Sequence, residues 1–566
     1  MPVLYRDRNF VFFLSVLCVC LFGGLTARAQ GPGRSRVSPT PTPPVVVITQ
    51  PTPAAVPTGA MQTLSDLQAK ITGRLSRPEV RRGQIGVKIV ALNSGKVIFE
   101  QNGEKYLMPA SNMKNFTVAA ALEKLSPDFR FVTSVYAMSQ PDSSGTIKGD
   151  LRIYGRGDVS VSTAFFGTSP NDPQTYYKGI DRLVDKIVAA GVKRVEGNLV
   201  GDESYFRGSP IPGSWEYDDL QWYYGAEISA LPINDNAVDL TVKPGPTGYP
   251  CTVKLLPFNP VMRVNNQCTT TGSGTSRTLE INKKPNGNVL DITGTLPAGD
   301  NGFSGSIAIS HPAELFLALL RQRLQERGVT ITGQIRTVTT DSGFTPGQPV
   351  GMGNTIGTAP FPGPIEIARL ESPPFSEIAA KTMKPSQNMY TETILWTLGE
   401  KWREEMTAVA ATNGGKPPSG NSDTLGLTVT KAFRTQIGIP DDAVIQHDGC
   451  GLSRHDLITP SAVIQLYTYM AKQSRYSQVW RDALTIAGVD GTLRNRFKGT
   501  PGAGNVRGKT GTIDQVSALS GYLTTAGGEP VVFSVVVNGV PDGGTRVSLI
   551  DEIVLSVVNF NGKIDQ

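Results

Sequence analysis

The chain has 566 residues, which is too many for one ordinary domain and enough for about two to four. Hydrophobic residues make up 39% and charged residues 18%, a composition that favours a large buried core and argues against wholesale disorder. The net charge of +6 is spread along the chain, and no basic run is interleaved with aromatic residues, so nucleic-acid binding has little support.

The first residues predict export. Arg6 and Arg8 precede an almost wholly apolar run over 10–25, and residues 27–29 give the small-x-small pattern Ala-Arg-Ala. The run is shorter than the roughly 20 residues that a membrane-spanning helix needs, so a cleaved signal peptide over 1–29 is favoured over an uncleaved anchor. We see no other stretch that is apolar and long enough to cross a bilayer.

The next segments predict a linker and then the start of a folded domain. Residues 30–60 are rich in proline, threonine, serine and valine, which is typical of an extended linker. From Met61 onward, apolar residues at helical spacing predict a helix. A hairpin with strands at 85–90 and 97–99 follows, and then a helix over about 111–125.

The middle of the chain has a different character. Strand-like segments alternate with turns, and glycine, proline and asparagine are dense. We interpret residues 134–345 as one or two β-rich domains inserted into the first fold, and 244–305 as almost wholly strand and loop. Within the insertion we expect three strands and two helices, at 149–155, 197–202, 237–242, 179–190 and 314–327.

The last third of the chain predicts helices and a second hairpin. Residues 365–397 are interpreted as mostly helical, with an interruption at Pro385. A hairpin and a final helix are expected at 516–523, 531–538 and 546–560. The segments 61–133 and 346–566 should therefore form one discontinuous domain of α/β (α+β) class, an antiparallel sheet with helices on both faces.

One short motif indicates chemistry. Ser111 and Lys114 form S-x-x-K at the start of a predicted helix, where positions i and i+3 share a face. An amine beside a hydroxyl can turn a poor nucleophile into a good one. The pattern is expected about once by chance in a chain of this length, so it needs support from other residues.

A histidine-based triad has weak support. The chain has three histidines, and no G-x-S-x-G elbow is present. His311 precedes a proline at a helix start, where a cap or surface role is favoured. His447 and His455 lie around one loop, and we prefer a structural or positioning role for them. No His/Cys/Asp cluster has ligand spacing, so we predict neither a metal nor a cofactor.

Lysine as the base has better support. K-T-G occurs once, at 509–511, and leads towards a strand. S-x-N occurs at 386–388 between two predicted helices, whereas its matches at 169–171 and 419–421 lie in loops rich in turn formers. The chain therefore carries S-x-x-K, S-x-N and K-T-G in this order, and the first motif places Lys114 one helical turn from Ser111.

These motifs resemble those of the active-site-serine penicillin-recognising enzymes, which carry them in this order. The long stretch between Ser111 and Ser386 is similar to the D-alanyl-D-alanine carboxypeptidase/endopeptidase branch, of the penicillin-binding-protein-4 type. The resemblance implies a serine β-lactamase/transpeptidase-like domain interrupted by a β-rich insertion. It covers about 61–560 and includes further similar stretches at 201–206, 215–220, 229–236, 448–454 and 488–494.

The resemblance implies a role for each motif residue. Ser111 would form an acyl-enzyme with the carbonyl of the penultimate D-alanine, and Lys114, held neutral, would accept the serine proton. Ser386 would relay a proton to the departing amine. Asn388 would orient Lys114 and the substrate backbone.

The K-T-G segment is implied to bind substrate. Lys509 would supply a positive field that favours neutral Lys114 and, with Thr510, would bind the terminal carboxylate. Gly511 and Thr512 continue this strand, and the backbone N–H groups of Thr512 and Ser111 would form the oxyanion hole.

The insertion has an implied part in recognition. In this branch an acidic residue near aromatic residues contacts the amine end of the stem-peptide side chain. Asp218, flanked by Trp215 and Tyr223, matches that pattern. An ordinary loop carboxylate over an aromatic cluster is the alternative.

Three cysteines remain after the signal peptide. Cys251 and Cys268 are close in sequence, and an exported chain can oxidise them to a local disulfide. Cys450 has no obvious partner and stands where the branch usually has serine. It is interpreted either as a small buried residue or as an oxidisable thiol beside the site.

The sequence therefore predicts a periplasmic or exported serine peptidase that acts on peptidoglycan stem peptides and is acylated by β-lactams. Two alternatives are a β-lactam hydrolase of related fold, disfavoured by the long insertion, and a non-catalytic wall-binding protein, disfavoured by three intact motifs. A homodimer is left open.

Overall fold

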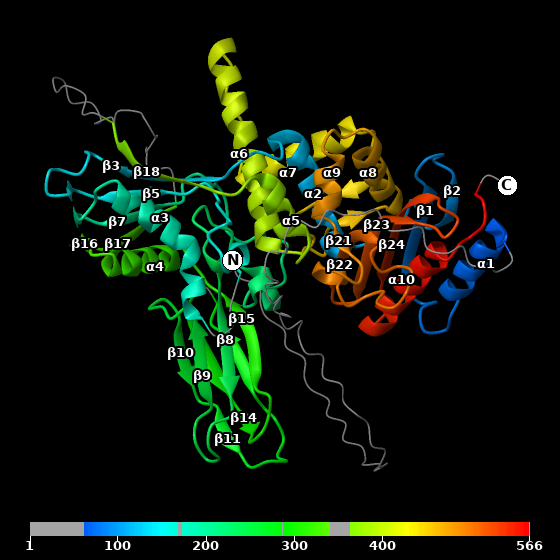
Figure 1. Ribbon diagram of the computed structural model, residues 1–566, viewed down its shortest axis with the longest axis horizontal. Coiled ribbons are helices and arrows are strands. Elements are labelled where there is room, and N and C mark those ends of the chain that lie inside the picture. The colour runs from blue at the N-terminus through cyan, green and yellow to red at the C-terminus, as the bar shows by residue number, and fades with distance from the viewer. Residues whose placement is uncertain (1–60, 168–171, 286, 340–362, 565–566) are drawn as a thin grey trace, which may run out of the picture. The chain divides into compact units, whose positions relative to one another are not determined.

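A computed structural model describes residues 61–167, 172–285, 287–339 and 363–564 (Figure 1). The predicted signal peptide and linker lie outside the described residues, as does the S-x-N match at 169–171. Within the described residues, no helix is both long and apolar enough to cross a membrane.

A six-stranded antiparallel sheet forms the framework of the first domain. Its strand order is β2-β1-β24-β23-β22-β21. The hairpins from the two ends of the chain meet where Ile85 pairs with Val537, so the outer segments form one sheet, as predicted. The strands are β1 (Gln84–Ala91), β2 (Val97–Gln101), β21 (Thr485–Ile486), β22 (Arg507–Ile513), β23 (Val516–Thr524) and β24 (Pro530–Asn538).

Helices cover both faces of this sheet because its central strands are apolar on both sides. In β24, Val535 and Val537 pack with α1 (Leu64–Leu75) and α10 (Gly543–Val558), which contact each other (Figure 1). Val536 points to the opposite core. That core holds α2 (Lys114–Leu125), α5 (Phe375–Met383), α6 (Asn388–Asn413), α7 (Ser422–Gln436), α8 (Pro460–Lys472) and α9 (Ser477–Ala483).

The inserted region begins with a mixed sheet of order β17-β7-β5-β3-β18 and a smaller one of order β16-β6-β4. Two helices bury apolar side chains against these strands, α3 (Lys178–Ala189) and α4 (Pro312–Glu326). The strands are β3 (Val132–Ala137), β4 (Thr146–Lys148), β5 (Leu151–Tyr154), β6 (Arg194–Glu196), β7 (Leu199–Asp202), β16 (Thr330–Ile331), β17 (Ile335–Val338) and β18 (Ile365–Glu371).

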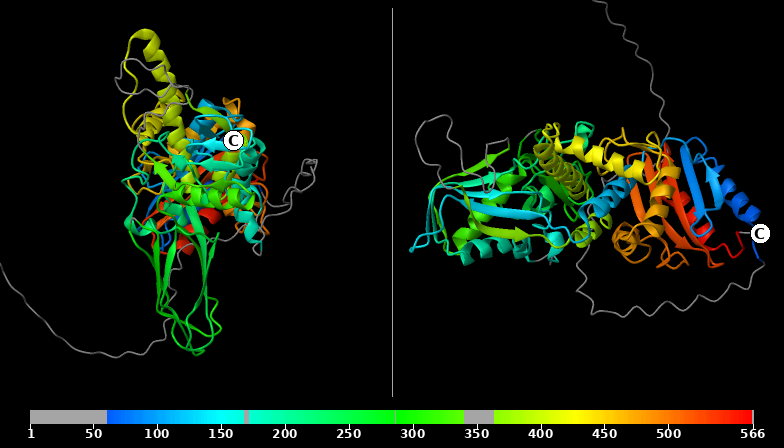
Figure 2. Two further views of the ribbon diagram at one scale, coloured as in Figure 1. Left: turned by 90° about the vertical axis from the view of Figure 1, so that its left-hand side faces the viewer. Right: turned by 90° about the horizontal axis from the view of Figure 1, so that it is seen from above.

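The described residues of 244–305 are strand and loop, as predicted, and are drawn in green in Figure 2. Cys251 and Cys268 form a disulfide here, which confirms the pairing inferred from their spacing. Three small sheets contain β8 (Ala237–Lys243), β9 (Thr252–Leu256), β10 (Arg263–Asn266), β11 (Thr269–Thr271), β12 (Glu280–Lys283), β13 (Val289–Thr293), β14 (Thr295–Pro297) and β15 (Phe303–Ala308).

The helical interpretation of 365–397 is wrong at its beginning. Residues 365–371 form β18, which pairs antiparallel with β3 in the sheet of the insertion. A bulge between Glu366 and Ala368 shifts the alternation of apolar and charged residues, so the two-residue period of a strand is broken in the sequence. The boundaries at 133 and 345 remain predictions, although β3 of this sheet crosses the first and β18 lies beyond the second.

Candidate active site

Ser111 and Lys114 lie where the chain enters α2. Residues Ala110–Met113 form a 3-10 turn before that helix, and in a 3-10 helix positions i and i+3 lie directly above one another. Lys114 Nζ is 2.9 Å from Ser111 Oγ. The S-x-x-K spacing therefore brings the hydroxyl and the amine together, as expected from the sequence.

Lys114 is fully buried and has two further partners. Its Nζ lies 2.6 Å from Asn388 Oδ1, at the first residue of α6, and 2.8 Å from the carbonyl oxygen of Cys450. Burial lowers the pKa of the Lys114 ammonium, and nearby Cys450, Asp448 and Glu392 oppose that shift. A lowered pKa is what a lysine needs to act as a base near neutral pH.

Ser386 and Lys509 form a second pair. Lys509 Nζ on β22 donates to Ser386 Oγ at 2.7 Å and to its neighbour Thr510 O at 2.8 Å. Ser386 has φ +64°, a left-handed conformation that is costly for a residue with a side chain and is common at functional sites. Burial, together with the charge of Lys114, lowers the pKa of Lys509 well below its ordinary range.

The K-T-G strand lies against the turn Ala110–Met113, which carries Ser111. A Cβ at Gly511 would approach Pro109 O at 2.5 Å, so glycine is required for this contact. Asn112 Nδ2 donates to Lys509 O, which ties the turn to β22. Thr510 is buried and donates to Thr492 Oγ1, whereas Thr512 is exposed.

The insertion reaches the site through two segments. Trp215 is buried and its Nε1 donates to Asp448 Oδ2 at 2.9 Å, and Asn388 Nδ2 donates to Tyr224 O. Asp218 is exposed on the turn Tyr217–Asp219. The half-buried ring of Tyr223 contacts that of Tyr224 edge-on.

Comparison with known proteins decides the family. The model of the D-Ala-D-Ala carboxypeptidase 3 (S13) family matches residues 67–556. The chain belongs to this family. Membership identifies the protein as a serine-type peptidase, as predicted from the three motifs.

Two curated relatives span nearly the whole chain. A D-alanyl-D-alanine carboxypeptidase from an Actinomadura strain is 30% identical over 510 residues, covering 88% of this chain and 86% of that protein. The D-alanyl-D-alanine carboxypeptidase DacB of Haemophilus influenzae is 25% identical over 497 residues, covering 86% and 91%.

The solved structure of penicillin-binding protein 4 from Haemophilus influenzae is similar to this chain, with a TM-score of 0.68 and 24% identity. The similarity covers 89% of this chain and 100% of that one. It confirms the predicted fold class. A second structure of that protein, complexed with a β-lactam, has a TM-score of 0.63.

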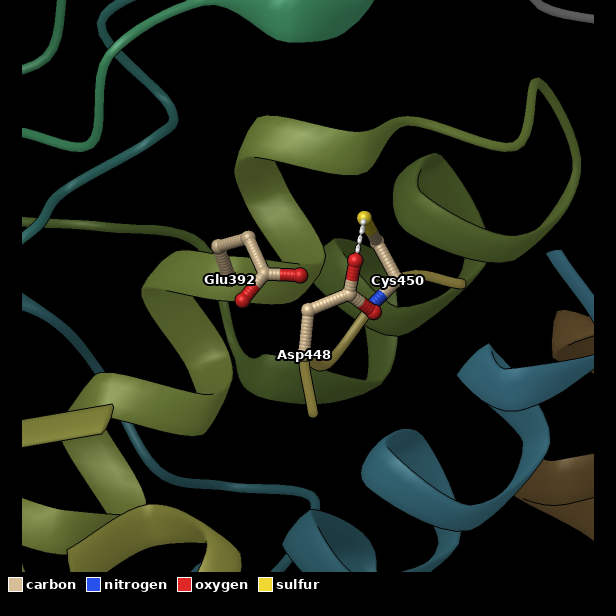
Figure 3. A group of neighbouring side chains, drawn as sticks. All are labelled: Glu392, Asp448 and Cys450. Atoms are coloured by element: carbon tan, nitrogen blue, oxygen red, sulfur yellow. Dashed lines mark hydrogen bonds between the residues drawn. The ribbon is translucent and has the colours of Figure 1, made fainter. Parts of the chain in front are cut away.

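The loop between β19 (Val444–Ile445) and β20 (Leu457–Ile458) contributes to this candidate site through contacts that the sequence did not reveal. Asp448 and Cys450 come from the loop, and Glu392 faces them from α6 (Figure 3). All three are buried. Burial raises the pKa of Glu392 to about 8, and the carboxyl group of Asp448 adds to this effect.

Each of these three residues offers one ligand atom, and the atoms lie within 4.8 Å of one another. The carboxyl groups, however, already accept backbone N–H groups, Glu392 from Gly449 and Asp448 from Cys450 and Gly451. A cation would have to displace these donors, so we assign no metal to this group.

Cys450 is a free, buried thiol, and burial raises its pKa well above the ordinary range. Its Sγ lies 3.6 Å from Asp448 Oδ2. A thiol kept protonated away from solvent is a poor nucleophile. His447 and His455 are exposed at the same loop, with ring centroids 5.6 Å apart, and His311 is exposed at the N-cap of α4 without a side-chain cap hydrogen bond.

Proposed function

We propose that this protein is an exported D-Ala-D-Ala carboxypeptidase with D,D-endopeptidase activity, which cleaves peptidoglycan stem peptides through an acyl-enzyme on Ser111. The observation that carries the proposal is the 2.9 Å contact between Lys114 Nζ and Ser111 Oγ, with the Lys509–Ser386 pair in the same site. Family membership supports the same reaction class.

Acylation begins with proton transfer. Neutral Lys114 accepts the Ser111 hydroxyl proton, and Oγ attacks the carbonyl carbon of the penultimate D-alanine. The negative oxygen that develops is bound by the backbone N–H groups of Ser111 and Thr512. The lowered pKa of buried Lys114 supports this step, because a protonated lysine has no lone pair to accept the proton.

The peptide C–N bond then breaks. Ser386 relays the proton that Lys114 accepted to the departing amine of the terminal D-alanine, while Lys509 and Thr510 bind the carboxylate of that residue. The hydrogen bond from Lys509 Nζ to Ser386 Oγ supports both roles, because it holds the amine and the hydroxyl together in this site. Water attacks the resulting ester, which releases the shortened peptide and restores the Ser111 hydroxyl.

Recognition of the stem-peptide side chain is assigned to the insertion. Exposed Asp218 pairs with a cationic amine, and Trp215 and Tyr223 provide the apolar wall for the chain that carries it. The hydrogen bond from Trp215 to Asp448 supports this assignment, because it ties the segment to the loop that contacts Lys114.

β-Lactams are proposed as acylating inhibitors of the same serine, and the signal peptide over 1–29 as the route of export. The penicillin-binding protein 4 structure complexed with a β-lactam supports the first point for a protein of this fold. The family match supports the second indirectly, since cell-wall peptides lie outside the cytoplasm.

The proposal is tested with a fluorescent penicillin. We compare the mature protein, Ser111→Ala and the exposed-surface control Ser143→Ala. A stable adduct on the native protein and the control, absent from Ser111→Ala, supports the proposal. Rapid turnover of the drug would favour a β-lactam hydrolase, and no adduct on the native protein would favour a non-catalytic wall-binding protein.

Substrate assays then separate the two peptidase activities. Release of D-alanine from a pentapeptide measures the carboxypeptidase reaction, and cleavage of a cross-linked stem-peptide dimer measures the endopeptidase reaction. Both activities should disappear in Ser111→Ala, because both would use the same acyl-enzyme. Retention of either one in that variant would contradict the shared mechanism.

A further inference from the structure

The β19–β20 loop presents a backbone carbonyl to Lys114. Cys450 O is 2.8 Å from Lys114 Nζ, and Asn388 Oδ1 is 2.6 Å away. A neutral amine has two N–H bonds and one lone pair. If the two oxygens accept the two N–H groups, the lone pair is left facing Ser111 Oγ, which is the orientation that a base needs.

Asp448 sets the shape of this loop. Its Oδ1 accepts the N–H groups of Cys450 at 3.0 Å and Gly451 at 2.6 Å. Its Oδ2 accepts the Ser453 N–H at 2.8 Å and Trp215 Nε1 at 2.9 Å. A single buried carboxyl group thus gathers four N–H donors around the peptide unit that carries the Cys450 carbonyl.

Other contacts hold the loop against both helices of the site. Glu392 lies one turn after Asn388 on α6 and accepts the Gly449 N–H at 2.8 Å. Thr117 Oγ1 on α2 donates to Gly449 O at 2.8 Å. A Cβ at Gly451 would lie 1.8 Å from Ala110 O, so the loop also packs directly against the nucleophile turn.

We propose that Asp448 is a positioning residue for the general base. By folding the loop it fixes the Cys450 carbonyl, and that carbonyl together with Asn388 Oδ1 aims the Lys114 lone pair at Ser111 Oγ. Asp448 itself does not touch the reacting atoms. The inference rests on the proposed acyl-enzyme mechanism and adds to it a second acceptor and the residue that holds it.

Asp448→Asn is the sharpest change, because it keeps the size of the side chain. An asparagine offers one carbonyl oxygen and turns an NH₂ group towards N–H donors, so half of the loop contacts become unfavourable. Asp441→Asn is the matched control, since Asp441 is an exposed carboxylate just before β19.

The rate constant of acylation by fluorescent penicillin is measured at a series of pH values. Each value is expressed per site that finally reacts, so that unfolded molecules do not lower it. At high pH all Lys114 is neutral, so the plateau rate reports positioning alone. We expect the plateau of Asp448→Asn to fall by roughly 10- to 100-fold, because small misplacements of reacting groups have costs of this size. Asp441→Asn should match the native protein.

The pH profile gives a second readout. Removing the Asp448 charge and loosening the Cys450 carbonyl both disfavour the Lys114 ammonium. The rise of the acylation rate constant with pH should therefore occur at lower pH in Asp448→Asn than in the native protein. If Asp448 had a merely structural role, Asp448→Asn would lower the number of reactive sites and leave the plateau rate per site unchanged. An unchanged plateau on an enzyme that acylates would overturn this inference alone.

Thr117→Val serves if Asp448→Asn does not fold. It removes the Thr117–Gly449 hydrogen bond while keeping side-chain volume, and should lower the plateau rate several-fold. An undiminished rate in this variant would also count against the inference. Absence of any adduct on the native protein would overturn the proposed function and this inference together.

Discussion

Asn388 Oδ1 lies 2.6 Å from Lys114 Nζ although 274 positions separate the two residues in the chain. Asn388 begins α6 two residues after the left-handed Ser386, and α6 packs against α2. The contact joins the two sequence segments on either side of the insertion. The base of the proposed mechanism is therefore held by residues from both.

Replacing the base should stop acylation. Lys114→Gln keeps a polar side chain of similar length but cannot accept the serine proton, and general-base catalysis typically contributes about 10²- to 10⁴-fold. We expect the penicillin acylation rate to fall by that amount. Lys70→Gln, at an exposed position of α1, is the control and should react at the native rate. A fast Lys114→Gln enzyme would remove lysine from the proposed role.

Acylation should become faster as pH rises, because only the neutral form of Lys114 can accept a proton. Burial lowers the pKa of Lys114, so the acylation rate constant should rise at a pH below the pKa of an ordinary lysine, which is about 10.4. The rate constant is measured from about pH 5 to pH 10. A rate that is independent of pH, or that falls in this range, would contradict the assignment.

Gly511→Ala should separate the K-T-G strand from the nucleophile turn. The added Cβ would meet Pro109 O at 2.5 Å, and backbone must move to relieve the contact. We expect an acylation rate at least about tenfold lower, since misplacement of this kind has large effects on rate. The matched control is Gly73→Ala in α1, where an added Cβ meets nothing within 4 Å. This substitution should stabilise the helix by about 1 kcal/mol.

Glu392 should make stability depend on pH. Burial raises its pKa from 4.5 to about 8, so the folded protein holds this proton more tightly than the unfolded chain. Its contribution to stability is complete below about pH 4.5 and is lost as pH rises through about 8, at about 1.36 kcal/mol per pKa unit.

The comparison is Glu392→Gln, which cannot ionise. Between pH 5 and pH 9 the Tm of the native protein should fall relative to the Tm of this variant, because only the native side chain must give up its proton inside the fold. The control is Glu404→Gln at an exposed position of the same helix, which should track the native protein. A constant difference between native and Glu392→Gln at all pH values would contradict the raised pKa.

Asp218→Asn should affect substrates according to their charge. With a stem peptide that ends in a free side-chain amine, kcat/KM should fall by roughly 10- to 100-fold, because a charge-assisted hydrogen bond is lost. With the same peptide acetylated at that amine the fall should be much smaller. An equal effect on both peptides would favour the ordinary loop carboxylate instead.

Much of the framework was predictable because the outer segments have regular periods. The hairpins at 85–99 and 516–538 and the amphipathic helix near residue 64 appear where apolar spacing predicted them. The S-x-x-K pair was also predictable, since residues i and i+3 meet in any helical turn. β18 was missed because its bulge interrupts the alternation that identifies a strand.

The contacts behind Lys114 could not be predicted in the same way. Cys450 acts there through its backbone carbonyl, which no side-chain motif records. The Trp215–Asp448 hydrogen bond joins residues 233 positions apart, and local patterns carry no information on such a pairing. Glu392 had one weak signal in the sequence. It lies four residues after Asn388, and this spacing places both residues on the same face of a helix.

The most direct test of the account is the mass of the penicillin adduct and its position in the chain. The mature protein is reacted with benzylpenicillin, its intact mass is measured, and the modified peptide is sequenced. We predict one adduct per chain, carried by Ser111 and absent from Ser111→Ala. An adduct on any other residue, or a native protein that stays unmodified, would contradict Ser111 as the nucleophile.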